Sequence, residues 1–153
     1  MTLYETLVLI HVVMVAVWVG GGIVTQHFAA LILREGDPIR IGGFSRDIAW
    51  IANRITLPAA AILLLSGLWA AQEGNWDFGA AWISIAFTVW IVAIVAGLVL
   101  LRPEYARISS LLPEIGSNVD AVAQRLRRIL LFSRIELVLL LIAVWAMVVK
   151  PGM

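Results

Sequence analysis

His11 is the residue of this chain best suited to hold a metal or move a proton, because its imidazole lies inside a long apolar run. With a helical rise of 1.5 Å per residue, His11 lies roughly 12 Å inside one boundary of that run. Ionisable groups at such depth in a membrane segment are rare and by default suggest a functional site. A neutral imidazole ligates a metal or a haem iron, or relays a proton. The alternative is a structural histidine that bonds a hydroxyl or carbonyl on a neighbouring helix.

The second histidine, His27, follows His11 by sixteen positions, which is about 24 Å along a helix and about 160° around it. The two histidines of one straight helix therefore cannot clamp one haem. A haem would need another second ligand, such as Met147, an open position, or a histidine from a second protomer. We expect His27 to be an interfacial residue. The absence of cysteine excludes thiolate metal sites and cysteine nucleophiles.

Trp18 and Gly22 share the helical stripe of His11, so these three residues are expected to face neighbouring helices. Gly22 ends a run of three glycines that begins at Gly20, and each glycine costs about 1 kcal/mol relative to alanine in a helix. This cost predicts a close approach. It allows two interpretations: tight helix packing through small residues, or room for a planar ligand beside Trp18 and His11.

Arg54 is the arginine most suited to a site, since it precedes a proline within the second apolar region. We expect Arg54 to form an ion pair with Glu136 between helices, because charge at the edge of the hydrocarbon is much less costly when paired. The functional alternative is an arginine pocket for a propionate, a phosphate or a lipid head group. Walker, GxSxG, HExxH and dinucleotide-binding patterns do not occur, so no catalytic residue is assigned.

The composition requires a membrane to position these residues. Of 153 residues, 62% are hydrophobic and only 14% are charged, and the mean hydropathy is +0.99. Such a chain has too little polar surface for water, which predicts an integral membrane protein with the lipid bilayer as its main partner. The net charge of +1 gives no reason to expect nucleic acid. No linker separates parts of the chain, so residues 1–153 are expected to form one domain.

Four apolar runs are long enough to cross about 30 Å of hydrocarbon. Backbone groups in lipid must be paired within the span, and runs of this length and period are helices. The predicted fold is all-α, a four-transmembrane-helix bundle. Its expected spans run from about Leu7 to Leu33, Ile55 to Ala71, Ala80 to Leu101 and Ile129 to Val149.

Charge is distributed unevenly between the two sides of these spans. All the arginines fall on one side, whereas Glu5, Glu73, Asp77 and the single Lys150 fall on the other. The positive-inside tendency places the arginine-rich segments in the cytoplasm and both termini outside the cell membrane. The arginines are Arg34, Arg40, Arg46, Arg54, Arg102, Arg107, Arg125, Arg127, Arg128 and Arg134.

Capping patterns predict that the helices extend beyond the bilayer on the cytoplasmic side. Gly36 is expected to end the first helix, and Asp37 with Pro38 to begin the second. Ser117, followed by Asp120, predicts a capping box and a fourth helix that starts near Asn118. A proline at position 103 predicts a kink where the third helix leaves the membrane.

Several motifs together resemble a bacterial family of predicted four-helix integral membrane proteins of unknown function, over nearly the whole chain. This resemblance implies a fold and a membrane location but no activity. The motifs are His11 to Gly22, Arg54 to Pro58, Ser66-Gly67-Leu68-Trp69, Trp76-Asp77-Phe78, Ser133-Arg134-Ile135-Glu136 and Lys150-Pro151-Gly152.

A more distant resemblance is to HemJ-type protoporphyrinogen oxidases and CopD-type membrane domains, whose first helix also carries a histidine before a Trp-Gly element. His11 matches that histidine, which in the HemJ type is associated with haem b. The lysine that the HemJ type carries on a later helix has no counterpart in Ala81-Trp82-Ile83-Ser84. The resemblance therefore implies haem binding more than oxidase activity.

Two functions fit these observations best. The first is a haem-b-binding membrane protein with a redox role, in which His11 is the axial metal ligand, Trp18 and Gly22 lie beside the haem, and Arg54 lies near its propionates. The second is a non-enzymatic scaffold or accessory subunit of a larger membrane complex, and a homo-oligomer suits either. A small transporter is least supported because the spans lack a polar stripe.

Overall fold

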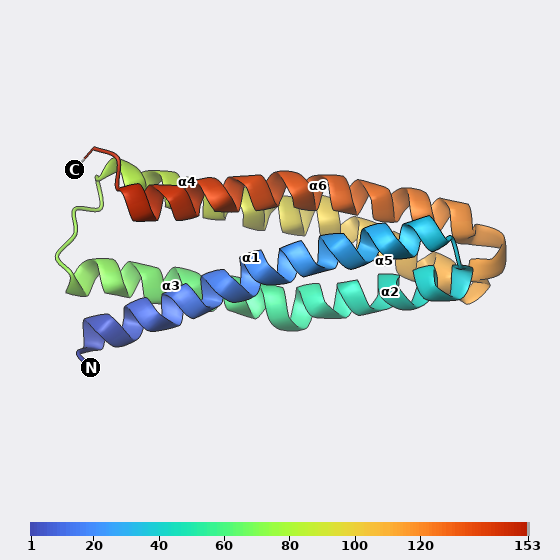
Figure 1. Ribbon diagram of the computed structural model, residues 1–153, viewed down its shortest axis with the longest axis horizontal. Coiled ribbons are helices and arrows are strands. Elements are labelled where there is room, and N and C mark those ends of the chain that lie inside the picture. The colour runs from blue at the N-terminus through green and yellow to red at the C-terminus, as the bar shows by residue number, and fades with distance from the viewer. Residues whose placement is uncertain (153) are drawn as a thin grey trace.

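The computed structural model describes residues 1–152, and every regular element within that range is helical. The chain doubles back along one long axis, so that both termini lie at the same end (Figure 1). We call this the terminal end, and the opposite end the arginine end. The elements are α1 (Leu3–Glu35), α2 (Pro38–Ile51), η1 (Ala52–Thr56), α3 (Leu57–Glu73), α4 (Ala81–Ala96), η2 (Gly97–Leu101), α5 (Arg102–Leu111), η3 (Leu112–Glu114) and α6 (Ile115–Val149).

Three continuous helical segments of the described chain are long and apolar enough to cross a membrane, whereas the sequence predicted four separate spans. The segments are Leu3–Glu35, Pro38–Glu73 and Ala81–Val149. The third segment contains both the third and the fourth expected spans. It stays helical throughout because its reversal is made by the 3-10 turn η3 between α5 and α6 and not by a loop. As a result α4 and α6 pack against each other (Figure 1).

Local capping explains the first helix boundaries. The Thr2 hydroxyl accepts a hydrogen bond from the Glu5 backbone N–H at 3.2 Å, and the Glu5 carboxylate accepts one from the Thr2 N–H at 2.9 Å. These two bonds satisfy donors that have no partner within the helix. Gly36 ends α1 in the left-handed conformation with φ 70°, and the Asp37 carboxylate caps α2 by accepting from the Ile39 N–H. The predicted boundary between the first two helices is confirmed.

The predicted capping box at the start of the last helix is wrong. Helix α6 begins at Ile115, directly after η3, and its N-cap residue Glu114 makes no side-chain cap. The Ser117 hydroxyl instead donates to the Glu114 carbonyl at 3.0 Å. Because the chain enters α6 from a 3-10 turn, the turn itself supplies the helical start before the polar residues are reached.

Two π-helical segments interrupt the membrane helices, and each directly precedes a proline turn. The segment η1 is followed by Leu57 and Pro58, and η2 is followed by Arg102 and Pro103. Proline cannot donate a hydrogen bond to the carbonyl four residues before it, so the regular ladder cannot continue there. The wider π turn accommodates that defect, and such turns are frequent at functional sites. At Pro103, where the sequence predicts a kink, a π segment directly precedes the proline, and the kink itself stays a prediction.

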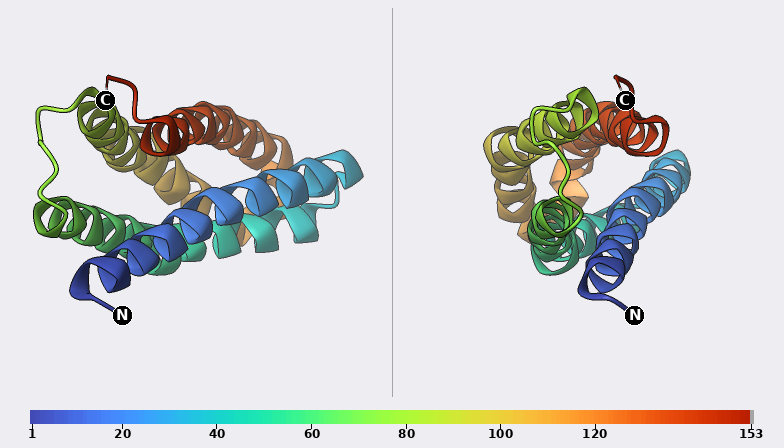
Figure 2. Two further views of the ribbon diagram at one scale, coloured as in Figure 1. Left: turned by 60° about the vertical axis from the view of Figure 1, so that its left-hand side comes forward. Right: turned by 90° about the vertical axis from the view of Figure 1, so that its left-hand side faces the viewer.

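The helices pack as two pairs, α1 with α3 and α4 with α6, which are joined along α1 and α6. At the arginine end α2 and α5 also pack on α6, and buried Ile41, Ile108 and Ile129 fill the space between them. Helices α3 and α4 make few contacts with each other: the Trp90 indole N–H donates to the Ala60 carbonyl at 3.0 Å, and the loop of residues 74–80 connects them at the terminal end. Figure 2 shows this separation of the two pairs. The fold is therefore closed at the arginine end and parted at the terminal end.

The outward faces of the long helices are strongly apolar. Large side chains such as Val12, Leu65, Val99 and Val138 are more than half exposed along them. Contiguous apolar surface of this extent is incompatible with water but suits acyl chains. The exposed faces therefore agree with an integral membrane protein.

Candidate functional site

A cavity of about 500 Å³ lies between the two helix pairs at the terminal end. We call it the terminal cavity. It is of the size that proteins use for cofactors and small ligands. Its lining is dominated by apolar and aromatic side chains, and the polar side chains among them belong to Tyr4, His11, Lys150 and the tryptophans Trp18, Trp76, Trp82 and Trp90.

His11 reaches this cavity from α1, and α3 fixes the orientation of its ring. The His11 Nδ1 lies 2.9 Å from the carbonyl oxygen of Leu63. A carbonyl oxygen only accepts hydrogen bonds, so Nδ1 must carry the proton. In the neutral ring Nε2 then keeps its lone pair, and Nε2 has no hydrogen-bond partner among residues 1–152. The half-buried ring therefore keeps an unused lone pair on a side chain that lines the terminal cavity.

Gly67 makes room for the His11 ring. A methyl group placed on Gly67 would lie 2.7 Å from His11 Cε1 and 2.8 Å from Nδ1, which is closer than van der Waals contact allows. Gly67 and Leu63 are four residues apart, so they lie on the same face of α3. One face of α3 thus supplies both the hydrogen bond that orients the imidazole and the space that the imidazole occupies.

Aromatic residues form the mouth of the terminal cavity near the chain termini. The rings of Trp76 and Trp82 meet edge to face, with centroids 5.5 Å apart. The ammonium group of Lys150 lies 3.9 Å from the centre of the Trp76 ring and 5.4 Å from that of Trp82. This arrangement is a cation–π contact at the edge of an apolar space. Met147 also lines the cavity.

A smaller cavity of about 150 Å³ lies further toward the arginine end. We call it the central cavity. Residues of both π segments line it, among them Asn53 and Gly97, together with the carboxylate-bearing Glu136. Trp18 lines both cavities and is buried between them. Its indole Nε1 donates to the Glu136 carboxylate at 3.1 Å, so this pair separates the two spaces.

The three glycines Gly20 to Gly22 of α1 do not pack closely against another helix, which was one of the two interpretations of this glycine run. A methyl group placed on Gly20 or Gly21 would meet nothing within 4 Å, and one on Gly22 would meet only the Leu137 side chain at 3.7 Å. Gly21 and Gly22 instead border the central cavity. Gly22 is therefore near Trp18, as expected, but it lines a different cavity from His11.

Arg54 does not form the predicted ion pair with Glu136. Arg54 is exposed, lines neither cavity, and makes no ion pair among the described residues. It lies inside η1, where the wider turn shifts side chains around the helix axis. Glu136 takes its hydrogen bond from Trp18 instead. His27 is exposed, in agreement with the interfacial placement.

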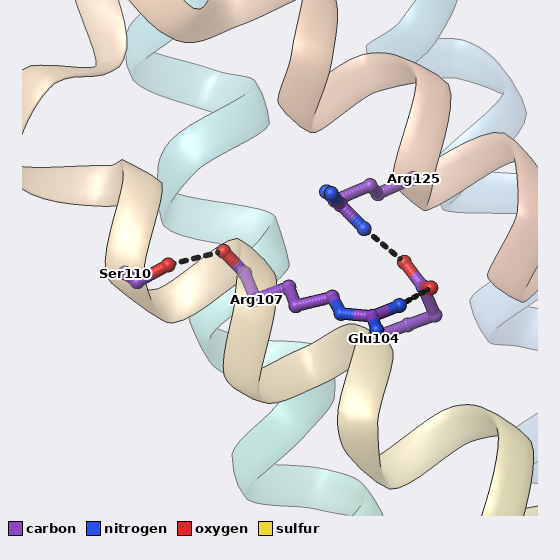
Figure 3. Close-up of polar contacts among 4 residues, drawn as sticks. All are labelled: Glu104, Arg107, Ser110 and Arg125. Carbon is purple, nitrogen blue, oxygen red and sulfur yellow. Dashed lines mark hydrogen bonds and ion pairs between the residues drawn. The ribbon is translucent and has the colours of Figure 1, made fainter.

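The best-paired charge of the molecule lies at the arginine end, away from both cavities. Buried Glu104 accepts hydrogen bonds from Arg125 at 2.9 Å and from Arg107 at 2.8 Å (Figure 3). The hydrogen bond from Arg125 holds the pKa of Glu104 below its usual value, although burial acts in the opposite direction. The bond from Arg125 joins α6 to α5, and Arg107 binds the same carboxylate from within α5, so we assign this cluster a structural role.

No group of three or more histidine, cysteine, aspartate or glutamate side chains comes together in residues 1–152 to hold a metal ion. The terminal cavity offers something different: one imidazole with an unused nitrogen, on a space lined mainly by apolar and aromatic side chains. Such a space suits a metal cofactor whose own atoms supply most of the metal's ligands. The sequence pointed to His11 and Trp18, but Gly67, Trp82 and Lys150 were not predicted as parts of the same cavity. The sequence singled out Gly67 and Lys150 only as members of the motifs that resemble the family of membrane proteins of unknown function.

A family model described as "Predicted integral membrane protein (DUF2269)" matches residues 5–151. None of the curated proteins and none of the solved structures matches the chain. The match agrees with the predicted resemblance to membrane proteins of unknown function. The distant similarity to HemJ-type and CopD-type proteins stays a prediction.

Proposed function

Since the chain belongs to the DUF2269 family of predicted integral membrane proteins, we propose that it binds haem b in the terminal cavity, with His11 as an axial ligand. The observation that carries this proposal is the orientation of the imidazole. Its Nδ1–H is committed to the Leu63 carbonyl, which leaves Nε2 without a protein partner at the wall of a cavity of about 500 Å³. Metal-binding histidines commonly donate their second ring N–H to a carbonyl or carboxylate in this way.

The other residues of the cavity suit a flat apolar ring. Trp18, Trp90 and Phe87 line it, and aromatic side chains offer large apolar faces to a planar ligand. Met147 lines the same cavity and is the candidate for a second ligand. When bound, haem would supply one-electron chemistry, while the protein would set its position and exclude water. Gly22 and Arg54 do not line this cavity, so they have no direct part in the proposed site.

We further propose that the chain crosses the cell membrane four times as a four-helix bundle, with both termini outside. The reversal at η3 divides the third apolar segment into two crossings. The arginines gather at one end of the fold, and the single lysine lies at the other. The positive-inside tendency assigns the arginine end to the cytoplasm. In this orientation the terminal cavity opens toward the outer surface.

Purification of the full chain in mild detergent, after expression with haem available, tests the proposed function. We expect a Soret band in the wild type and its loss in His11→Ala. His27→Ala is the matched control, since it removes an exposed histidine of the same helix and should keep the band. Helical circular dichroism of both variants checks that they fold. A folded but colourless wild type would refute haem binding and support the scaffold alternative. A band that persists in His11→Ala would refute ligation by His11.

A further inference from the structure

The mouth of the terminal cavity carries two polar groups that ligation by His11 does not use. One is the ammonium of Lys150, the single lysine of the chain. The other is the indole N–H of Trp82, on the first turn of α4. Both residues line the cavity, and the ammonium lies 5.4 Å from the centre of the Trp82 ring.

The Trp82 indole nitrogen is buried without a hydrogen-bond partner among residues 1–152. The side chain is only 6% exposed, so water does not readily satisfy this donor. A buried donor without an acceptor costs about 1–3 kcal/mol. In the described part of the chain it is the one buried side-chain nitrogen or oxygen left in this state. Trp82 therefore carries an unsatisfied donor on a side chain that lines the terminal cavity.

Lys150 lacks a negative partner in the same region. No aspartate or glutamate lines the terminal cavity, and none of the ion pairs among residues 1–152 includes Lys150. The contact with the Trp76 ring holds the ammonium at the mouth but does not neutralise it. The apolar terminal cavity is thus lined by a cation and by a tryptophan with an unpaired N–H donor, and no carboxylate side chain lines it.

We propose that Lys150 and Trp82 bind the carboxylate of a flat apolar ligand whose body fills the terminal cavity. The aromatic side chains of the cavity favour a flat apolar ring, and Lys150 with Trp82 favours a carboxylate on that ring. A carboxylate accepts from both groups at once, and hydrogen bonds to charged groups are stronger than neutral ones. This inference rests on the proposed function for the shape of the ligand, but it requires no iron and no ligation by His11.

Metal-free protoporphyrin IX and its dimethyl ester test this inference, because they share the flat ring and differ in their two carboxylates. Each is titrated into the purified full chain in detergent, and binding is followed by quenching of tryptophan fluorescence. We expect the diacid to bind about tenfold more tightly than the diester. In Lys150→Met this preference should fall close to one, with the affinity for the diester unchanged, and Lys150→Arg should restore it.

Arg54→Met is the matched control, since it removes one positive charge from an exposed residue outside both cavities. It should leave the preference for the diacid intact. Equal binding of diacid and diester by the wild type, an unchanged preference in Lys150→Met, or no binding of either compound would overturn the inference. The result is separate from haem ligation: His11→Ala should lose the Soret band yet keep the preference for the diacid.

Discussion

Replacement of Gly67 by alanine should disturb the His11 ring more than any other single methyl group added to the glycines of the membrane helices. The new methyl carbon would lie 2.7 Å from His11 Cε1, whereas carbon atoms pack at about 3.5 Å or more. The ring must therefore retreat from α3 by about 0.8 Å. Retreat in that direction carries the 2.9 Å hydrogen bond between Nδ1 and the Leu63 carbonyl to about 3.7 Å, which no longer counts as a bond.

The expected cost combines two effects. Overpacking of a filled site costs about 1–3 kcal/mol, and the loss of one hydrogen bond adds about 1 kcal/mol. Gly67→Ala should thus lower the free energy of unfolding by about 2–4 kcal/mol. Unfolding of the detergent-solubilised protein by SDS, followed by helical circular dichroism, measures the change. The Soret band should weaken in parallel, because the imidazole loses the bond that orients it.

Two comparisons make this expectation refutable. Gly21→Ala adds the same methyl group where nothing lies within 4 Å, so it should leave stability unchanged or raise it. In a His11→Ala background the obstructing ring is absent, and Gly67→Ala should then cost little. If Gly67→Ala is as harmless as Gly21→Ala, or equally harmful with and without the His11 ring, the proposed contact does not control the position of His11.

Two further predictions concern the arginine end and the topology. Because hydrogen bonding to Arg125 lowers the folded-state pKa of Glu104, the stabilisation by this cluster should be complete above the ordinary value of about 4.5 and be lost as the pH falls through the lowered pKa. Glu104→Gln should weaken this pH dependence of the unfolding free energy, and Asp120→Asn, at an exposed carboxylate, should not. In the cysteine-free chain, a single cysteine at Gln72 should be labelled by an impermeant maleimide added to intact cells, because this position lies outside in the proposed topology. A single cysteine at Ser109 should not be labelled, because this position lies in the cytoplasm. Labelling of Ser109→Cys, or none of Gln72→Cys, would contradict outside termini.

Features set by neighbouring residues could be predicted from the sequence. Gly36 and Asp37 fix the boundary of the first two helices through backbone conformation and a local cap, and neither depends on distant contacts. The placement of His11 toward other helices follows from its stripe on α1. The structural alternative, a bond to a carbonyl of another helix, is observed at this residue, and its side chain also lines the terminal cavity. The functional alternative, ligation of a metal or haem iron, stays a proposal.

Features set by the register between helices could not be predicted. Gly67 meets His11 only because α1 and α3 cross at one particular height, and sequence spacing within one helix does not contain that information. Lys150 reaches Trp76 because the end of α6 lies beside the loop before α4. Arg54 lies in a π segment, where a count based on 3.6 residues per turn no longer predicts the position of a side chain around the helix.

The two π segments lie at the same level of the fold, because residues of both line the central cavity. The regular α-helical hydrogen bonding is therefore interrupted at this level both between α2 and α3 and between α4 and α5. Beyond that level α3 and α4 make few contacts with each other, whereas α3 packs on the continuous helix α1 and α4 on the continuous helix α6. A change in the spacing of the two helix pairs at the terminal end would therefore leave the contacts within each pair in place.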